Sequence, residues 1–156
     1  EKPTISYQNG KLTFYSATEG AVCHSTITDT DITSYDTNEV QLGVTYNISV
    51  YATKTGYENS ETATATLCWI DVEPKTEGIN SVAQVRANAV MIKTNGGEIT
   101  IEGADENTSI TVYTLDGVQV GAATCWNGIA FINTNLKCDS IAIVKIGNKS
   151  VKVQIK

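Results

Sequence analysis

Few residues in this chain could do chemistry, and they are widely spaced: one histidine, four cysteines and a short segment with three aspartates. Nucleophilic catalysis needs a nucleophile beside a base. His24 follows Cys23 in a segment that predicts a strand, and neighbouring strand residues point to opposite faces. Cys23 and His24 therefore cannot pair directly, and we expect His24 to occupy an ordinary strand position.

The three aspartates, Asp29, Asp31 and Asp36, raise the question of calcium, which prefers oxygen ligands. The segment lacks the glycine and the closing glutamate of an EF-hand loop. The other interpretation is a turn in which aspartate side chains bond their own backbone. We favour the turn and assign no metal ligand.

The four cysteines are Cys23, Cys68, Cys125 and Cys138, with no CxxC pair that would indicate a zinc ribbon. A disulfide between Cys125 and Cys138 would close a short loop around one strand, and it is the better candidate. Cys23 and Cys68 lie at opposite ends of a sheet if their strands run parallel. Free buried thiols are the alternative.

The exposed aromatic with the best prospect of touching a ligand is Trp126, in an expected turn beside Cys125. Aromatic rings can stack on sugar faces, but packing is the competing role. We expect Trp69 to pack at a domain junction. No phosphate loop, dinucleotide fingerprint or nucleophile elbow occurs in the sequence. The sequence therefore predicts no catalytic, cofactor-binding or metal residue, and a protein that is not an enzyme.

Alternation of apolar and polar residues with a period of two dominates the chain and predicts strands throughout. Residues 1–70 contain several short strands separated by turns, typical of an immunoglobulin-like or fibronectin type III-like sandwich. Residues 71–78 are polar, contain a proline and predict a linker. Residues 79–156 contain Asp116-Gly117 and Gly147-Asn148 between apolar runs, which predicts two hairpins in a second sandwich. The predicted fold is all-β, with two small sandwiches in tandem.

Charge is unevenly distributed along the chain. Residues 1–73 hold three basic and ten acidic groups, a net −7, while residues 74–156 hold eight basic and seven acidic groups, a net +1. This change supports a domain boundary near residue 73. The overall charge of −6 disfavours a nucleic-acid partner, which needs a basic face. No run of 18 apolar residues predicts a membrane span. We expect a monomer.

The segment Ser49-Val50-Tyr51-Ala52-Thr53-Lys54-Thr55-Gly56-Tyr57-Glu58-Asn59-Ser60-Glu61 resembles the "A-x-A-x-x-x-G-Y-x-x-S" end of chitobiase C-terminal-like, fibronectin type III-like domains. Such domains occur in surface proteins of Bacteroidetes. Thr28-Asp29 with Thr33 and Ser34 loosely matches that family's "Y-T-x-D-G-x-x-P-T" hairpin, without its glycine and proline. The resemblance covers residues 3–70 and implies a spacer domain.

The second half resembles the C-terminal sorting domain of proteins exported by the type IX secretion system. Residues 110–120 are similar to the "V-Y-x-x-x-G-x-x-V" motif, and residues 143–156 resemble the terminal hairpin. Ile79-Asn80-Ser81-Val82 stands where that family has "Y-P-N-P". A functional sorting signal and a degenerate structural cap are both compatible with this pattern.

These resemblances imply a secreted or cell-surface protein, with the periplasm as the alternative location. The chain would act as a non-catalytic spacer and sorting or anchoring tail. Its partners would be upstream domains of the parent protein, the secretion machinery or a surface glycan. The rival hypothesis is an accessory carbohydrate-binding module that uses Trp126.

Overall fold

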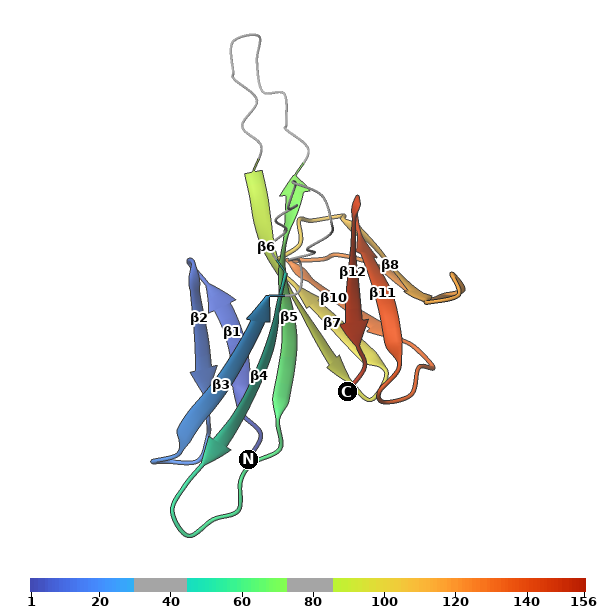
Figure 1. Cartoon of the computed structure of the whole chain (residues 1–156). Coiled ribbons are helices and arrows are strands. Elements are labelled where there is room, and N and C mark those ends of the chain that lie inside the picture. The colour runs from blue at the N-terminus through green and yellow to red at the C-terminus, as the bar shows by residue number, and fades with distance from the viewer. Residues whose placement is uncertain (30–44, 73–85) are drawn as a thin grey trace, which may run out of the picture. The chain divides into compact units, whose positions relative to one another are not determined.

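The computed structural model describes residues 1–29, 45–72 and 86–156, and all regular elements in these ranges are β-strands (Figure 1). The protein is therefore all-β and of the sandwich type, which confirms the fold class predicted from the alternation. It divides into two compact units, residues 1–67 and 68–156. That each unit is a complete, independent sandwich domain stays a prediction.

Unit 1 contains strands β1 (Thr4–Gln8), β2 (Lys11–Tyr15), β3 (Val22–Asp29), β4 (Thr45–Thr53) and the first part of β5 (Ala63–Val72). Strands β1 and β2 form an antiparallel hairpin. Its turn residues Asn9 and Gly10 have φ of 51° and 76°. This left-handed pair is what a two-residue type I′ turn requires, and Asn-Gly is its preferred sequence.

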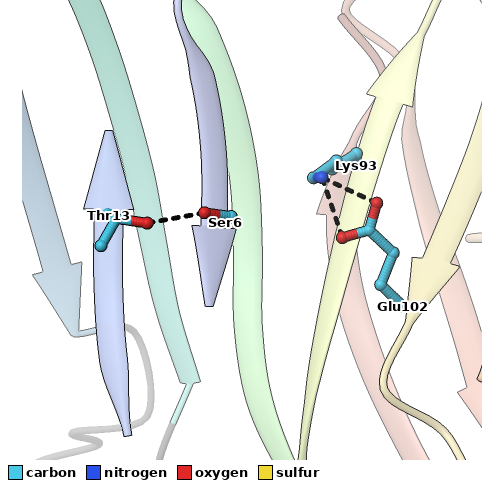
Figure 2. Close-up of polar contacts among 4 residues, drawn as sticks. All are labelled: Ser6, Thr13, Lys93 and Glu102. Carbon is cyan, nitrogen blue, oxygen red and sulfur yellow. Dashed lines mark hydrogen bonds and ion pairs between the residues drawn. The ribbon is translucent and has the colours of Figure 1, made fainter. Parts of the chain in front are cut away.

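The second sheet of unit 1 has the order β5-β4-β3. Ile48, Val50 and Ala52 of β4 alternate with more exposed residues and are at most 5% exposed. Alternate side chains point to opposite faces, so this row defines the buried face of the sheet. On the hairpin, Ser6 and Thr13 face each other across the strands, with their hydroxyl oxygens 2.6 Å apart (Figure 2).

Unit 2 contains the end of β5, then β6 (Arg86–Asn95), β7 (Glu98–Glu102), β8 (Ser109–Thr114), β9 (Gln119–Thr124), β10 (Ile129–Asn133), β11 (Ile141–Ile146) and β12 (Lys149–Gln154). One sheet has the order β10-β7-β6-β5 and the other β12-β11-β8-β9. The two hairpins that the sequence predicts at Asp116-Gly117 and Gly147-Asn148 are confirmed, and β6 and β7 form a third hairpin around Gly96-Gly97.

The core of unit 2 is built almost entirely from aliphatic side chains contributed by both of its sheets. Burying each large aliphatic residue contributes about 1.5–3 kcal/mol. The buried cluster comprises Cys68, Ile70, Val90, Ile92, Ile99, Ile101, Ala104, Ile110, Val112, Cys125, Ala130, Ile132, Ala142, Val144, Ile146, Val151, Val153 and Ile155.

Strand β5 changes its buried face where the two units meet in the sequence. In its first half the odd-numbered Ala63, Ala65 and Leu67 are buried, whereas in its second half the even-numbered Cys68 and Ile70 belong to the core of unit 2. Thr66 is buried as well, at 7% exposed, and alternate residues of a strand point to opposite faces, so residues 65–68 are covered on both faces and the switch extends over them. β5 also includes the first two residues of the predicted linker 71–78, whose other residues lie outside the described ranges.

The last residues of the chain are bonded into unit 2. Ile155 donates its N–H to the carbonyl of Ser140 at 2.9 Å, and Gly96 donates to the carbonyl of Lys156 at 2.6 Å. The hydroxyl of Thr94 donates to the carbonyl of Gln154 at 3.0 Å. Val151, Val153 and Ile155 are at most 3% exposed. β12 is therefore a structural strand of this unit.

Candidate functional site

Trp126 is the most exposed large apolar residue of the described chain, with 70% of its surface accessible. It begins a two-residue turn in which Trp126 and Ile129 exchange backbone hydrogen bonds of 2.9 and 3.0 Å. Asn127 and Gly128 in the turn have φ of 51° and 77°, the type I′ pattern again. Trp126 is thus displayed at a tight turn, as the sequence predicted, and it lies in solvent.

The neighbouring loop fixes this turn. Gly103 donates its N–H to the carbonyl of Gly128 at 2.8 Å, and Asn127 donates its N–H to a carboxylate oxygen of Glu106 at 2.7 Å. A hydrogen bond to a charged acceptor is stronger than a neutral one. The backbone that carries Trp126 is therefore held from two sides.

Two further apolar side chains share the face of Trp126. Ile129 is 42% exposed and Phe131 is 65% exposed, while Ala130 and Ile132 between and beyond them are buried. Trp126 is paired directly with Ile129, and directly paired residues of antiparallel strands lie on the same face. We name Trp126, Ile129 and Phe131 the β10 platform.

Trp126 is predicted from the sequence as an exposed aromatic residue, whereas Phe131 is not. Residues 129–132 read Ile-Ala-Phe-Ile, an apolar run that shows no polar face. Such a run is typical of a strand buried on both faces. The strand instead lies at the end of its sheet, beyond β7, and only one of its faces is covered. The Asn127-Gly128 turn was the available signal, because it fixes the pairing of Trp126 with Ile129 and hence the face of Phe131.

Polar residues border the β10 platform on β7 and β6. Ile129 is paired with Glu102 and Phe131 with Thr100. The ammonium of Lys93 donates to both carboxylate oxygens of Glu102, at 2.7 and 2.9 Å (Figure 2). Both side chains are about a third exposed, at 33% and 36%. Glu98, which lies across from Asn133 at the far end of β10, adds a carboxylate that forms no ion pair within the described residues, so the net charge of this border is negative.

All four cysteines are free thiols, so the predicted disulfide between Cys125 and Cys138 is wrong. Cys125 is fully buried in the core of unit 2 and its thiol donates to the carbonyl of Ala104 at 3.2 Å, whereas Cys138 is exposed. The alternative of free thiols holds for Cys23 and Cys68 as well.

Burial raises the pKa of the Cys125 thiol, and the negative charges of Glu106 and Asp105 act in the same direction. A hydrogen bond from the backbone of Gly128 opposes these effects in part. Removing a group from water disfavours its charged form. Cys125 is therefore a poor nucleophile, since the reactive form of cysteine is the thiolate.

His24 lies on β3, where it is paired with Tyr51 of β4. The two rings stack with centroids 5.1 Å apart, and Nε2 of His24 lies 2.8 Å from the hydroxyl oxygen of Thr53. Cys23 is paired with Ala52, on the other face of the sheet. The geometry thus separates the two side chains, as the alternation predicted.

Of the three aspartates considered for calcium, Asp29 ends β3, while Asp31 and Asp36 lie outside the described residues. In the described ranges, no three histidine, cysteine, aspartate or glutamate side chains gather closely enough to hold a metal ion. The same ranges contain no helix with the length and hydropathy needed to cross a membrane.

In comparisons with known proteins, no family model matched the chain, and no match was found among the curated proteins or the solved structures.

Proposed function

We propose that this chain is a non-catalytic part of an exported cell-surface protein, in which unit 2 is a sorting or anchoring module and unit 1 a spacer. One observation carries the proposal. The two segments that resemble a type IX sorting domain, residues 110–120 and 143–156, are far apart in the sequence, yet their strands make up a single four-stranded sheet, β12-β11-β8-β9.

The outer face of that sheet is the surface that a secretion receptor would touch. Ile143 is paired with Lys152 on one side and with Tyr113 on the other, and Lys145 is paired with Ser150 and Thr111. Lys145 and Lys152 are exposed. Neither ammonium group forms an ion pair with the part of the chain that the structure describes. Two such charges on a regular sheet give a receptor both a shape and a charge to recognise.

Unit 1 fits the role of a spacer. Its β1–β2 hairpin exposes a polar outer face, with the Ser6–Thr13 contact at its centre. The resemblance of residues 3–70 to fibronectin type III-like domains supports the same role. A spacer domain needs a stable fold and a polar surface, and it needs no catalytic or ligand-binding site.

The test is a reporter fusion in a bacterium that has the type IX route. The fused segment should be residues 68–156 rather than 79–156, because Cys68 and Ile70 belong to the core of unit 2. We expect the reporter at the cell surface or in the medium. A folded reporter that stays in the periplasm would contradict the sorting role.

Two controls sharpen this test. A reporter fused to residues 1–67 should remain in the periplasm, since unit 1 lacks the sorting-like sheet. Replacing both Lys145 and Lys152 with glutamate should reduce export without unfolding unit 2, because both residues are exposed. The same replacement at Lys137, an exposed lysine outside this sheet, should leave export unchanged.

A further inference from the structure

We infer that the β10 platform (Trp126, Ile129 and Phe131) binds a neutral polysaccharide chain. This binding activity is additional to the proposed sorting and spacer roles and does not depend on them. The starting observation is that three large apolar side chains, 70%, 42% and 65% exposed, occupy one face of one hairpin. Scattered single exposed apolar residues are normal on a protein surface, whereas the largest contiguous apolar patch of a protein is often functional.

The platform has the spacing of a sugar-binding surface. Trp126 lies directly across from Ile129, and Phe131 is two residues further along the strand. Strand spacing and rise therefore put the two aromatic residues on the order of 9 Å apart, roughly two sugar rings. An aromatic ring presents an apolar face that can stack on the C–H face of a sugar. Ile129 is the neighbour of both aromatic residues on this face, across from Trp126 and two residues before Phe131.

The size of the platform favours a glycan over a protein partner. A large aromatic side chain presents roughly 150–250 Å² at full exposure, so three partly exposed residues offer a few hundred Å². A stable protein interface needs about 800 Å² from each partner. The Lys93–Glu102 ion pair, on the neighbouring strands β6 and β7, limits the apolar surface on that side. An extended sugar chain needs only a narrow strip of this kind.

The border of the platform selects against acidic glycans. Glu98 and Glu102 lie on β7 beside it, and Glu106 bonds the turn itself. Lys93 neutralises Glu102 but leaves the other two carboxylates in place. Like charges repel, so a polyuronate or sulfated chain is disfavoured. The carboxylates and the Thr100 hydroxyl can instead accept or share hydrogen bonds with neutral sugar hydroxyls.

The backbone of the platform is fixed before any ligand arrives. The bonds Gly103–Gly128 and Asn127–Glu106, together with the two bonds between Trp126 and Ile129, hold the turn in one conformation. Binding then requires little ordering of the protein, which preserves affinity for a ligand that makes few contacts.

The experiment is affinity gel electrophoresis of the whole chain through gels that contain hydroxyethylcellulose, xyloglucan, galactomannan or starch, with polygalacturonate as the acidic comparison. We expect slower migration in at least one neutral polysaccharide and none in polygalacturonate. Trp126→Ala and Phe131→Ala should each weaken the interaction at least tenfold, and Trp126→Phe should keep part of it. Thermal melting should show that all three variants stay folded, since both positions are exposed.

Tyr57→Ala provides the matched control, because Tyr57 is an aromatic residue of unit 1 with 67% exposure. It should leave the migration unchanged. The inference is overturned if no neutral polysaccharide retards the chain, if the Trp126 and Phe131 variants migrate like the unmodified chain, or if polygalacturonate is preferred. It is also overturned if light scattering shows self-association that Trp126→Ala abolishes, which would make the platform an interface between copies. None of these results bears on export of the reporter.

Discussion

Gly121 of β9 lies directly against the side chain of Ile132 of β10: a Cβ added at position 121 would stand 2.5 Å from Cγ2 of Ile132. The two strands belong to different sheets of unit 2. Ile132 is 2% exposed and lies on the inner face of β10, opposite to the face that carries Phe131. This contact therefore helps to set how closely the sheets approach and, through β10, supports the platform.

Gly121→Ala should destabilise unit 2 by about 1–3 kcal/mol, the usual cost of overpacking a core. The φ of Gly121 is not positive, so the backbone accepts alanine and the effect is steric. Ile132→Ala alone should cost about 2–5 kcal/mol. In the double variant the costs should be less than additive, because the second change removes the methyl group that clashes. Urea unfolding followed by circular dichroism measures the free energy of unfolding of the two single variants and the double variant. If the two single losses add to the double loss within about 0.5 kcal/mol, the contact is contradicted.

Ile155→Ala should destabilise unit 2 by about 2–5 kcal/mol, although the residue is next to last in the chain. Its side chain is fully buried in the core, and its N–H is bonded to Ser140. Lys152→Ala, an exposed change on the preceding strand β12, should stay within about 0.5 kcal/mol. Thermal melting of the Ile155→Ala and Lys152→Ala variants measures both effects. If both variants lose equally little stability, the end of the chain frays and the expectation is contradicted.

Thiol labelling should follow burial. Cys138 is exposed and should react first, Cys23 is half-buried and should react more slowly, and the buried Cys68 and Cys125 should react only on unfolding. Mass spectrometry after timed labelling with iodoacetamide gives this order. Counting in denaturant without reductant should find four thiols, and a count of two would restore the disulfide between Cys125 and Cys138.

Cys125 should make stability sensitive to alkaline pH. Its pKa is raised in the folded protein, so on unfolding the thiol ionises at lower pH than it does in the native state. The stabilisation is fully present below the ordinary thiol pKa of about 8.5 and is lost as pH rises above it. Denaturation at pH 7 and at pH 9.5 should therefore show a smaller loss of stability for Cys125→Ser than for the unmodified chain. An equal loss in both would mean that Cys125 is not the group responsible.

The sequence by itself determined the local structure. The Asn9-Gly10 and Asn127-Gly128 turns have the left-handed backbone that these residue pairs favour, and the hairpin turn at Asp116-Gly117 lies where its glycine permits it. Alternation predicted the strands and the opposite faces of Cys23 and His24, because side-chain direction in a strand depends only on its period of two. Turn conformation and side-chain direction depend on interactions between residues close together in the chain, so a few consecutive residues are enough to predict them.

Only the tertiary structure decided which faces were covered. Leu67 and Cys68 are adjacent and both apolar, yet one is buried in unit 1 and the other in the core of unit 2. Packing likewise decided that Cys125 is a buried free thiol and that the ring of Phe131 lies in solvent. Burial depends on which strands pack across a sheet, and those contacts join residues far apart in the chain. Local alternation supplies two faces for each strand, and long-range packing chooses between them.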